Sequence, residues 1–165
     1  MLETSRLLIR KMVIEDAPFF YELVNDKDWK RFIGERNVHT IKDAEDYLTN
    51  KIIQSYHDIG FGFYIVIDKK SERPLGISGF VKRDELNHVD VGFAFLPIGR
   101  NKGYALESTK ALMKYGTMVL KFTTILGIAN NDNERSHILL EKLGLKFVKH
   151  IKMSQEEEEI SLFST

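Results

Sequence analysis

Hydrophobic and polar positions follow one another in a strand-like pattern along three consecutive stretches in the middle of the chain. Residues 61–68 (FGFYIVID) and 75–83 (LGISGFVKR) are joined by the polar turn KKSERP, and residues 88–97 (HVDVGFAFLP) follow closely. Connections this short join antiparallel neighbours. The three stretches therefore predict an antiparallel meander, and residues 7–13 predict an earlier strand.

Helical patterns surround this meander. Residues 15–24 have acidic residues and Pro18 in their opening turn, and Thr40 with Asp43 resembles a capping box that opens a helix to about Tyr56. Further helices are predicted over residues 103–120 and 133–143, the latter ended by Gly144. The remaining strands are predicted in TTILGIA (residues 123–129), KFVKHIKM and EISLFST, the last two paired around the acidic turn SQEEEE.

The predicted element order is βααβββαβαββ, which places the chain in the α/β (α+β) class. We expect one domain over residues 1–165, with a mixed, mostly antiparallel sheet of about seven strands flanked by about four helices. The strand over residues 88–97 has two different faces. Apolar residues predict a core face, and polar or small residues predict a face open enough for a cleft. The core-face residues are Val89, Val91, Phe93 and Phe95, and those of the other face are His88, Asp90, Gly92 and Ala94.

Composition narrows the functions that this fold could serve. Lysine plus arginine balance aspartate plus glutamate at 24 each, which gives no general field for nucleic acid or an anionic membrane. The absence of cysteine excludes disulfides, thiolate metal ligands and a cysteine nucleophile. No apolar run reaches the roughly 18 residues of a membrane span, and the histidines show no metal-ligand spacing. We expect a cytoplasmic protein with no metal, no nucleic-acid partner and no membrane partner.

The stretch GRNKGYALES, residues 99–108, predicts a local anion site. It lies between a predicted strand and a predicted helix, where unpaired amides and the helix dipole favour an anion. Gly103 and Ala105 are small enough to let a phosphate approach the backbone, and Arg100 and Lys102 add positive charge. An ordinary loop with solvated basic residues is the alternative. The spacings of the dinucleotide-binding and P-loop motifs are both missing.

The stretch also matches a family signature. Arg100 to Ala105 (RNKGYA) resembles the R/Q-x-x-G-x-G/A motif of the GNAT superfamily of acyl-CoA N-acyltransferases. Three further segments are similar to its RimJ/RimL-type branch: ETSRLLIRKMVIEDA, VDVGFAFLP and NDNERSHILLEKLGLKFV. Asn101 stands where glycine is common, but asparagine also adopts left-handed backbone conformations. Leu145 replaces a frequent phenylalanine at a core position.

The resemblance implies that acetyl-CoA is the acyl donor. Its pantetheine arm would lie in a splay between the strand ending near Leu96 and the strand beginning near Thr123, and would pair with the exposed backbone of Phe95 and its neighbours. The pyrophosphate would be held by the backbone amides of Arg100, Asn101, Lys102, Gly103, Tyr104 and Ala105.

The resemblance also implies roles for two residues of the next helix. Asn133 would contact coenzyme A, and Ser136 would be the general acid for the departing thiolate. The alternative is that Asn131 and Glu134 form a capping box while Asn133 and Ser136 only tolerate the first turn.

The acceptor implied by the family is an amine that attacks the thioester directly, since a cysteine acyl-enzyme cannot form here. Asp90 is our first candidate for the base, acting directly or through water, and His88 is the second. An ion-paired strand aspartate without a catalytic task is the alternative.

Three functions stay open at this point. The first is acetylation of an α-amine of a protein or peptide, as the RimJ/RimL resemblance implies. The second is acetylation of a small amine such as a polyamine, an amino acid or an aminoglycoside, and the third is a non-catalytic module that binds acyl-CoA. The sequence also leaves open whether the chain forms a homodimer.

Overall fold

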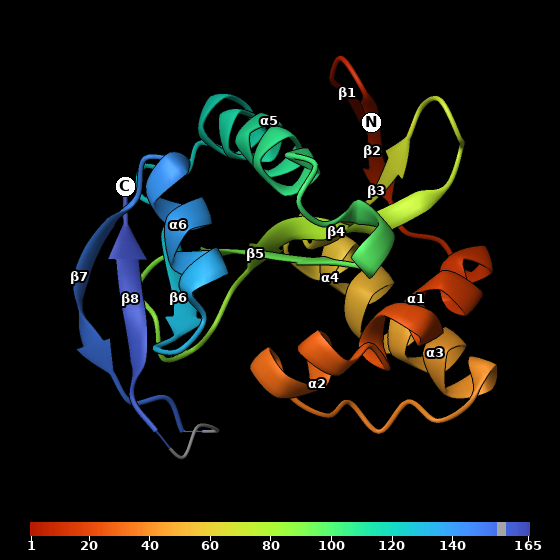
Figure 1. Ribbon diagram of the computed structural model, residues 1–165, viewed down its shortest axis with the longest axis horizontal. Coiled ribbons are helices and arrows are strands. Elements are labelled where there is room, and N and C mark those ends of the chain that lie inside the picture. The colour runs from red at the N-terminus through yellow and green to blue at the C-terminus, as the bar shows by residue number, and fades with distance from the viewer. Residues whose placement is uncertain (155–157) are drawn as a thin grey trace.

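A single mixed sheet forms the centre of the computed structural model, which describes residues 1–154 and 158–165 (Figure 1). Over these residues the sheet has eight strands in the order β1-β2-β3-β4-β5-β6-β8-β7, and neighbouring strands are antiparallel except for β5 and β6. The strands are β1 (Leu2–Glu3), β2 (Leu7–Lys11), β3 (Phe63–Asp68), β4 (Pro74–Val81), β5 (Asp90–Phe95), β6 (Leu126–Asn130), β7 (Lys146–Ile151) and β8 (Ile160–Ser164).

Helices cover both faces of this sheet. On one face lie α5 (Tyr104–Met118) and α6 (Glu134–Lys142). The other face carries α1 (Ala17–Val24), α2 (Lys27–Phe32), α3 (Ile41–Tyr47) and α4 (Gln54–Asp58), with a π-helical segment, Leu48–Ile53, between the last two. The described residues contain no helix that is both long and apolar enough to span a membrane.

Two hydrophobic clusters, one on each face, explain why the strands alternate as they do. In β3, Tyr64 and Val66 belong to the cluster beneath α5 and α6, whereas Ile65 between them belongs to the cluster beneath α1–α4. Successive strand residues point to opposite faces, so a sheet covered on both sides is apolar at consecutive positions. Both faces of the sheet therefore carry core residues. On the face of β5 that we expected to be open, Asp90 is buried, whereas Gly92 and Ala94 are partly exposed.

The predicted mixed fold is confirmed, and several local predictions hold in detail. Thr40 Oγ1 accepts from the amide of Asp43 (3.1 Å), and Asp43 Oδ2 accepts from the amide of Thr40 (2.8 Å), which is the predicted capping box. The tail forms the predicted antiparallel pair β7 and β8. Residues 155–157 of the predicted acidic turn lie outside the described residues.

Other elements differ from the prediction at their boundaries. The strand β1 and the short helix α2 were not predicted, and the helix expected from residue 15 begins as a 3₁₀ turn, Ile14–Asp16. The pattern did not show β1 because it is a two-residue strand. Asp26 begins α2 by accepting from the amide of Asp28 (3.0 Å), so α2 has an ordinary N-cap in a sequence too short for a periodic pattern.

The predicted splay lies between β5 and β6. Within the described part of the chain these parallel strands pair only through Asp90 with Leu126 and Val91 with Gly127, the first two residues of each strand. Beyond them β5 stays paired to β4 and β6 stays paired to β8, so the two strands separate. The opening widens toward the carboxyl ends of both strands, where the chain turns into α5 and α6.

Candidate active site

The loop between β5 and α5 is shaped by two left-handed residues. Asn101 has φ of 58° and Gly103 has φ of 79°. Glycine reaches this region freely and asparagine reaches it more readily than most residues, so the predicted tolerance of asparagine at position 101 is confirmed. A 3₁₀ turn over Pro97–Gly99 precedes these residues, and the amide of Glu107 bonds to the carbonyl of Gly103 (3.0 Å) as α5 begins.

This loop leaves a row of amides without a partner. The amides of Gly99 and Arg100 bond back to Leu96 (2.8 Å) and Pro97 (3.2 Å), but none from residue 101 to residue 106 donates a hydrogen bond to any described residue. They stand at the N-terminus of a helix of fifteen residues, where the dipole adds positive potential. An anion placed there would satisfy several of them at once.

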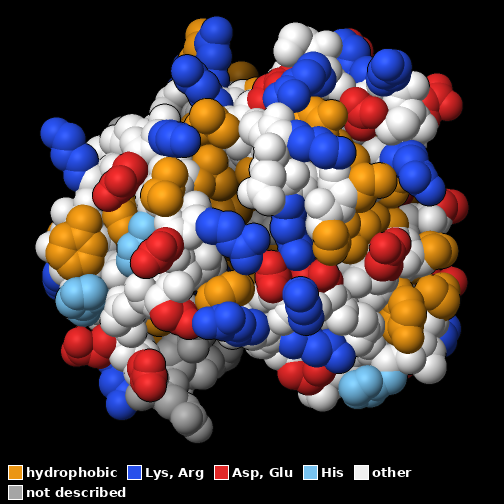
Figure 2. Space-filling model, in the orientation of Figure 1, with side chains coloured by type: hydrophobic (Ala, Val, Ile, Leu, Met, Phe, Trp, Pro, Cys, Tyr) orange, Lys and Arg blue, Asp and Glu red, His pale blue; other side chains and the backbone are white. Residues whose placement is uncertain are grey.

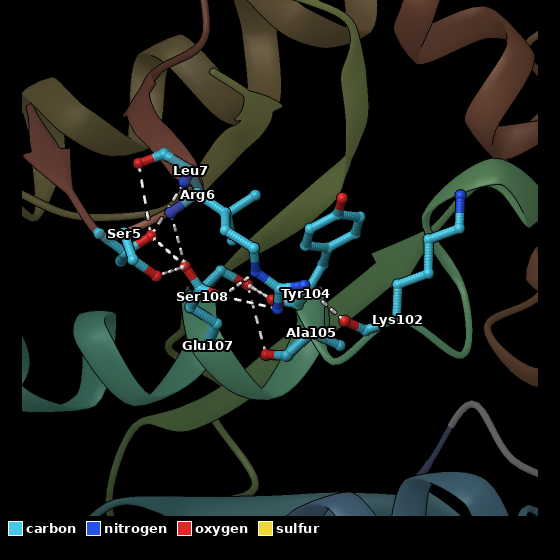
Figure 3. A network of polar contacts seen from close by, with 9 residues as sticks. Ser5, Arg6, Leu7, Lys102, Tyr104, Ala105, Glu107 and Ser108 are labelled. Atoms are coloured by element: carbon cyan, nitrogen blue, oxygen red, sulfur yellow. Dashed lines mark hydrogen bonds and ion pairs between the residues drawn. The ribbon is translucent and has the colours of Figure 1, made fainter. Parts of the chain in front are cut away.

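A network from the N-terminal strand region fixes this loop (Figure 3). Glu107 accepts from Thr4 Oγ1 (2.6 Å) and, through its two oxygens, from the amide of Arg6 (3.0 Å) and Arg6 Nε (2.7 Å). Arg6 Nη1 donates to the carbonyl of Lys102 (2.9 Å), and its guanidinium lies 4.4 Å from the centre of the Tyr104 ring. Arg6 and Glu107 therefore hold the loop in place, a role that sequence reasoning missed.

Three further residues predicted to bind the donor, Leu96, Lys102 and Ala105, differ in how they could contribute. The Lys102 side chain points away from the Arg6 and Glu107 network, while its carbonyl belongs to it (Figure 3). Ala105 follows Tyr104 in the first turn of α5 and adds no side chain beyond Cβ. Leu96 is buried, and its amide bonds to the carbonyl of Leu75 (2.9 Å), so that amide is already satisfied.

Arg100 does not offer free charge to an anion, contrary to our expectation. Its Nε donates to the carbonyl of Phe95 (2.8 Å), Nη1 lies 2.9 Å from Asp28 Oδ2, and Nη2 pairs with Asp26. All three nitrogens are thus bonded inside the protein. The side chain braces the loop against β5 and α2, and any anion at residues 101–106 is held chiefly by backbone amides.

Asp90 lies at the closed end of the splay, where β5 and β6 are still paired, but it is buried rather than open to a cleft. The residue is 1% exposed, and its Oδ1 accepts from Arg83 Nε (2.9 Å). Burial raises the pKa of the Asp90 carboxyl, and the guanidinium of Arg83 only partly opposes the increase. His88 lies just before β5 and is exposed. Asp90 is thus an ion-paired strand aspartate, as in the alternative raised from the sequence, and its role as base stays a prediction.

The opposite side of the splay is formed by the start of α6. Asn133 caps this helix, since its side-chain oxygen accepts from the amide of Ser136 (3.2 Å). The Ser136 hydroxyl donates to no described residue. The alternative box of Asn131 with Glu134 is wrong, because Asn131 bonds instead to the carbonyl of Glu159 (2.9 Å) and to the hydroxyl of Ser161 (2.7 Å).

The structure therefore arranges most predicted residues around one opening. Because β5 and β6 are parallel, the amide row that follows β5 and the start of α6 that follows β6 lie at the same end of the sheet, one on each side of the opening. Asp90 lies at the closed end of the opening. In the described part of the chain, no group of three acidic or histidine side chains is placed to hold a metal ion. We call the amides of residues 101–106 the cradle. Together with the open edge of β5, the cradle suits a long ligand with a phosphate group at one end.

Comparison with known proteins places the chain in a family. A family model described as an acetyltransferase (GNAT) domain matches residues 6–146. The chain belongs to the GNAT acetyltransferase family. Among curated proteins it is 26% identical over 145 residues to the uncharacterized N-acetyltransferase YnaD of Bacillus subtilis, covering 88% of this chain and 82% of that protein. It is accordingly an acetyl-transferring enzyme, and GNAT enzymes use acetyl-CoA.

Solved GNAT structures share its fold. The ribosomal-protein-S5-alanine acetyltransferase of Vibrio fischeri matches with a TM-score of 0.84 at 16% identity, over 99% of this chain and 94% of that one. The spermidine N-acetyltransferase of Vibrio cholerae, solved with CoA and spermine, matches with a TM-score of 0.80 at 16% identity, over 98% and 96%. Of the three functions considered from the sequence, membership of this family favours the two enzymatic ones.

Proposed function

We propose that this GNAT enzyme acetylates the α-amine of a protein or peptide, with the donor's pyrophosphate on the amides of residues 101–106 and its pantetheine arm in the splay. The observation that carries the donor part of the proposal is the row of partnerless amides beside the opening between β5 and β6. Amides at a helix N-terminus suit a pyrophosphate. Beyond Val91 the edge of β5 that faces β6 is unpaired apart from the carbonyl of Phe95, which accepts from Arg100 Nε, and such an edge suits the two amide groups of pantetheine.

The residues of the cradle fit a phosphate group in three ways. Asn101 and Gly103 have left-handed backbone conformations, which also occur in other anion-binding turns. Gly103 has no side chain, and a Cβ at this position would already lie 3.4 Å from Arg6 Nη2. Arg100 is held away by Asp26 and Asp28, so its bulk does not fill the cradle.

The transfer itself needs a base and an acid at the closed end of the splay. The amine nitrogen forms a bond to the acetyl carbon while the carbon–sulfur bond breaks, and the amine proton is lost. We propose that Asp90 takes this proton through a water molecule and that the Ser136 hydroxyl donates a proton to the leaving thiolate. The free hydroxyl of Ser136 and the burial of Asp90 at the closed end support these roles.

An α-amine loses its proton to such a base more readily than a lysine side chain does. Reference pKa values are about 7.7 to 8.0 for an α-amine and about 10.4 for lysine, so much of an α-amine is already neutral near pH 8. The resemblance of the N-terminal segment and of NDNERSHILLEKLGLKFV to RimJ/RimL-type sequences supports the same acceptor. The RimJ/RimL assignment itself is part of the proposal.

A matched panel of amines tests the acceptor. The panel contains a peptide with a free N-terminal alanine or serine, the same peptide with a blocked N-terminus and one free lysine, and spermidine, and the coenzyme A released is measured with a thiol reagent. We expect the highest kcat/KM for the free α-amine. A preference for spermidine would assign a small-amine acetyltransferase, and a preference for the blocked peptide would assign a lysine acetyltransferase.

A further inference from the structure

One carboxylate links both sides of the splay. Asp28, in the first turn of α2, receives Arg100 Nη1 at 2.9 Å and Arg135 Nη2 at 2.8 Å on the same oxygen, Oδ2. Arg100 follows β5, and Arg135 lies in the first turn of α6, which follows β6. The bridge Arg135–Asp28–Arg100 therefore runs from one side of the opening to the other through α2.

The surface view agrees with this arrangement. Figure 2 shows acidic side chains surrounded by basic ones near the centre of the face, in the region that lies between α2, α6 and the loop before α5 in Figure 1. Basic and acidic members of the cluster balance, since Arg100 and Arg135 face Asp26 and Asp28. The cluster therefore offers no surplus charge to attract a ligand, and its clearest function is mechanical.

The carboxylate at the centre of this bridge is more buried than that of an ordinary surface ion pair. The side chains of Asp26, Asp28 and Arg100 are 9%, 23% and 19% exposed. Arg135 is 59% exposed but pairs with the more buried Asp28, whereas both members of the neighbouring pair Arg31 and Asp132 are exposed, at 64% and 60%. Burial by itself would raise the pKa of Asp28, but the hydrogen bond from Arg135 and the charge of Arg100 lower it below its ordinary value. Exposed pairs contribute about 0–1 kcal/mol, whereas losing one partner of a buried pair costs more.

The bridge also lies on the side from which an amine would come. The amide row and α6 belong to the face of α5 and α6, while α2 is anchored by buried Trp29 in the cluster on the opposite face. A donor held by the first face leaves its acetyl group to be approached from the second. Through Asp28, α2 contacts a residue on each side of the opening, so its position limits where an amine can stand.

We propose that Asp28 is a positioning residue for acetyl transfer, which holds α2 in a fixed relation to the donor loop through Arg100 and to α6 through Arg135. The inference rests on the proposed function, because it assumes that the donor occupies the splay. Placing two reactants in one geometry contributes strongly to a transfer rate, and small displacements are costly. Asp28 itself touches neither reacting atom.

The test compares Asp28→Asn with Arg31→Gln in the full chain. We expect Asp28→Asn to lower kcat/KM for the amine about tenfold, while the acetyl-CoA Kd, measured by calorimetry, changes less than about threefold. The Kd should hold because the amide row stays and Arg100 keeps Asp26 and the Phe95 carbonyl. Arg31→Gln removes the ion pair between Arg31 of α2 and Asp132. We expect its kcat/KM for the amine and its acetyl-CoA Kd to stay near those of the parent.

A second set of variants separates positioning from simple destabilisation. Arg135→Gln should reproduce the loss caused by Asp28→Asn, Arg135→Lys should keep most of the activity, and Asp28→Asn combined with Arg135→Gln should be no worse than either alone. Equal effects of Asp28→Asn and Arg31→Gln, additive losses, or a parallel loss of acetyl-CoA affinity would overturn the inference. A parent that binds no acetyl-CoA and acetylates no amine would instead overturn the proposed function.

Discussion

The two sides of the splay are built by different means. On the side of β5 the cradle is made of main chain, with its shape set by the left-handed Asn101 and Gly103 and its place set by the Arg6 and Glu107 network. On the side of β6 the start of α6 presents side chains, with Asn133 as cap, Ser136 with a free hydroxyl and Arg135 as an exposed cation. The side of β5 suits the binding of an anion in a fixed position. The side of β6 suits side chains that exchange protons during a reaction.

This difference also decides how each side should respond to substitution. A substitution that changes the backbone conformation of residues 101–106 moves all of their amides together. We expect such a substitution to abolish acetyl-CoA binding as a whole. Changing one side chain on the other side should remove one role and leave the rest. Variants of the two sides should therefore separate donor binding from transfer.

The largest effect is expected from Gly103→Glu, with Gly60→Glu as its matched control. Both glycines are left-handed, with φ of 79° and 82°, but Gly60 has nothing within 4 Å of an added Cβ and lies far from the cradle in the sequence. A carboxylate at position 103 would repel the pyrophosphate, so we expect the acetyl-CoA Kd to rise roughly 100-fold or more, about 2.7 kcal/mol. Calorimetry should show parent-like affinity for Gly60→Glu. Equal losses in both variants would trace the effect to backbone strain instead.

Asp90→Asn should affect transfer and not donor binding. We expect kcat to fall about 100-fold, the usual scale for a lost general base, with an unchanged acetyl-CoA Kd. A base works in its deprotonated form, so the parent's rate should rise with pH through a pKa that burial has raised above the ordinary aspartate value.

His88→Gln is the control for this prediction and should keep the parent's pH profile. If Asp90→Asn retained full kcat while His88→Gln lost the rising limb of the pH profile, the role of base would belong to His88.

Glu107→Gln should weaken the network that holds the loop before α5 in place, although Glu107 does not itself contact the ligand. Burial alone would raise the pKa of Glu107, but its bonds from Thr4, Arg6 and Ser5 lower it. Such a group stabilises the fold above the ordinary glutamate pKa, and the contribution is lost as the pH falls through the lowered value. We expect about 2 kcal/mol less stability at pH 7 for the variant, and a smaller difference from the parent at low pH. Denaturant unfolding at both pH values measures this, and a difference that grew on acidification would contradict it.

Ser136→Ala should have the smallest effect on activity, with a smaller fall in kcat than Asp90→Asn, because a thiol has a reference pKa of about 8.5 and its thiolate leaves with little help from an acid. Asn133 Oδ1 bonds to the amide of residue 136, so the cap survives the substitution. Asn133→Ala removes the cap and should cost about 1 kcal/mol of stability. Thermal unfolding together with kcat separates the two, and unchanged kcat in Ser136→Ala would mean that another group or water protonates the thiolate.

Local sequence features predicted the backbone conformation of the loop before α5. The strand, the signature and the left-handed Asn101 all depend on interactions within a few residues, as does the capping box of Thr40 and Asp43. Short-range rules for turns and caps describe such features.

Contacts between distant segments could not be predicted in the same way. Arg100 meets Asp26 from 74 residues away, and Arg6 meets Glu107 from 101 residues away. The burial of Asp90 depends on Arg83 and on the packing of both faces of the sheet, which a pattern within one strand does not describe. For this reason the free charge of Arg100 and the open face at Asp90 were predicted wrongly.

Thermal unfolding with increasing acetyl-CoA, with pantetheine as control, tests most directly whether the amide row of residues 101–106 binds the donor. A ligand bound only by the native state stabilises it by about 2.7 kcal/mol at 100 times its Kd. For a chain of this length that corresponds to a rise in Tm of roughly 5–10 °C. We predict this rise with acetyl-CoA and none with pantetheine, which lacks the pyrophosphate. No rise with millimolar acetyl-CoA, or an equal rise with pantetheine, would contradict a pyrophosphate cradle at residues 101–106.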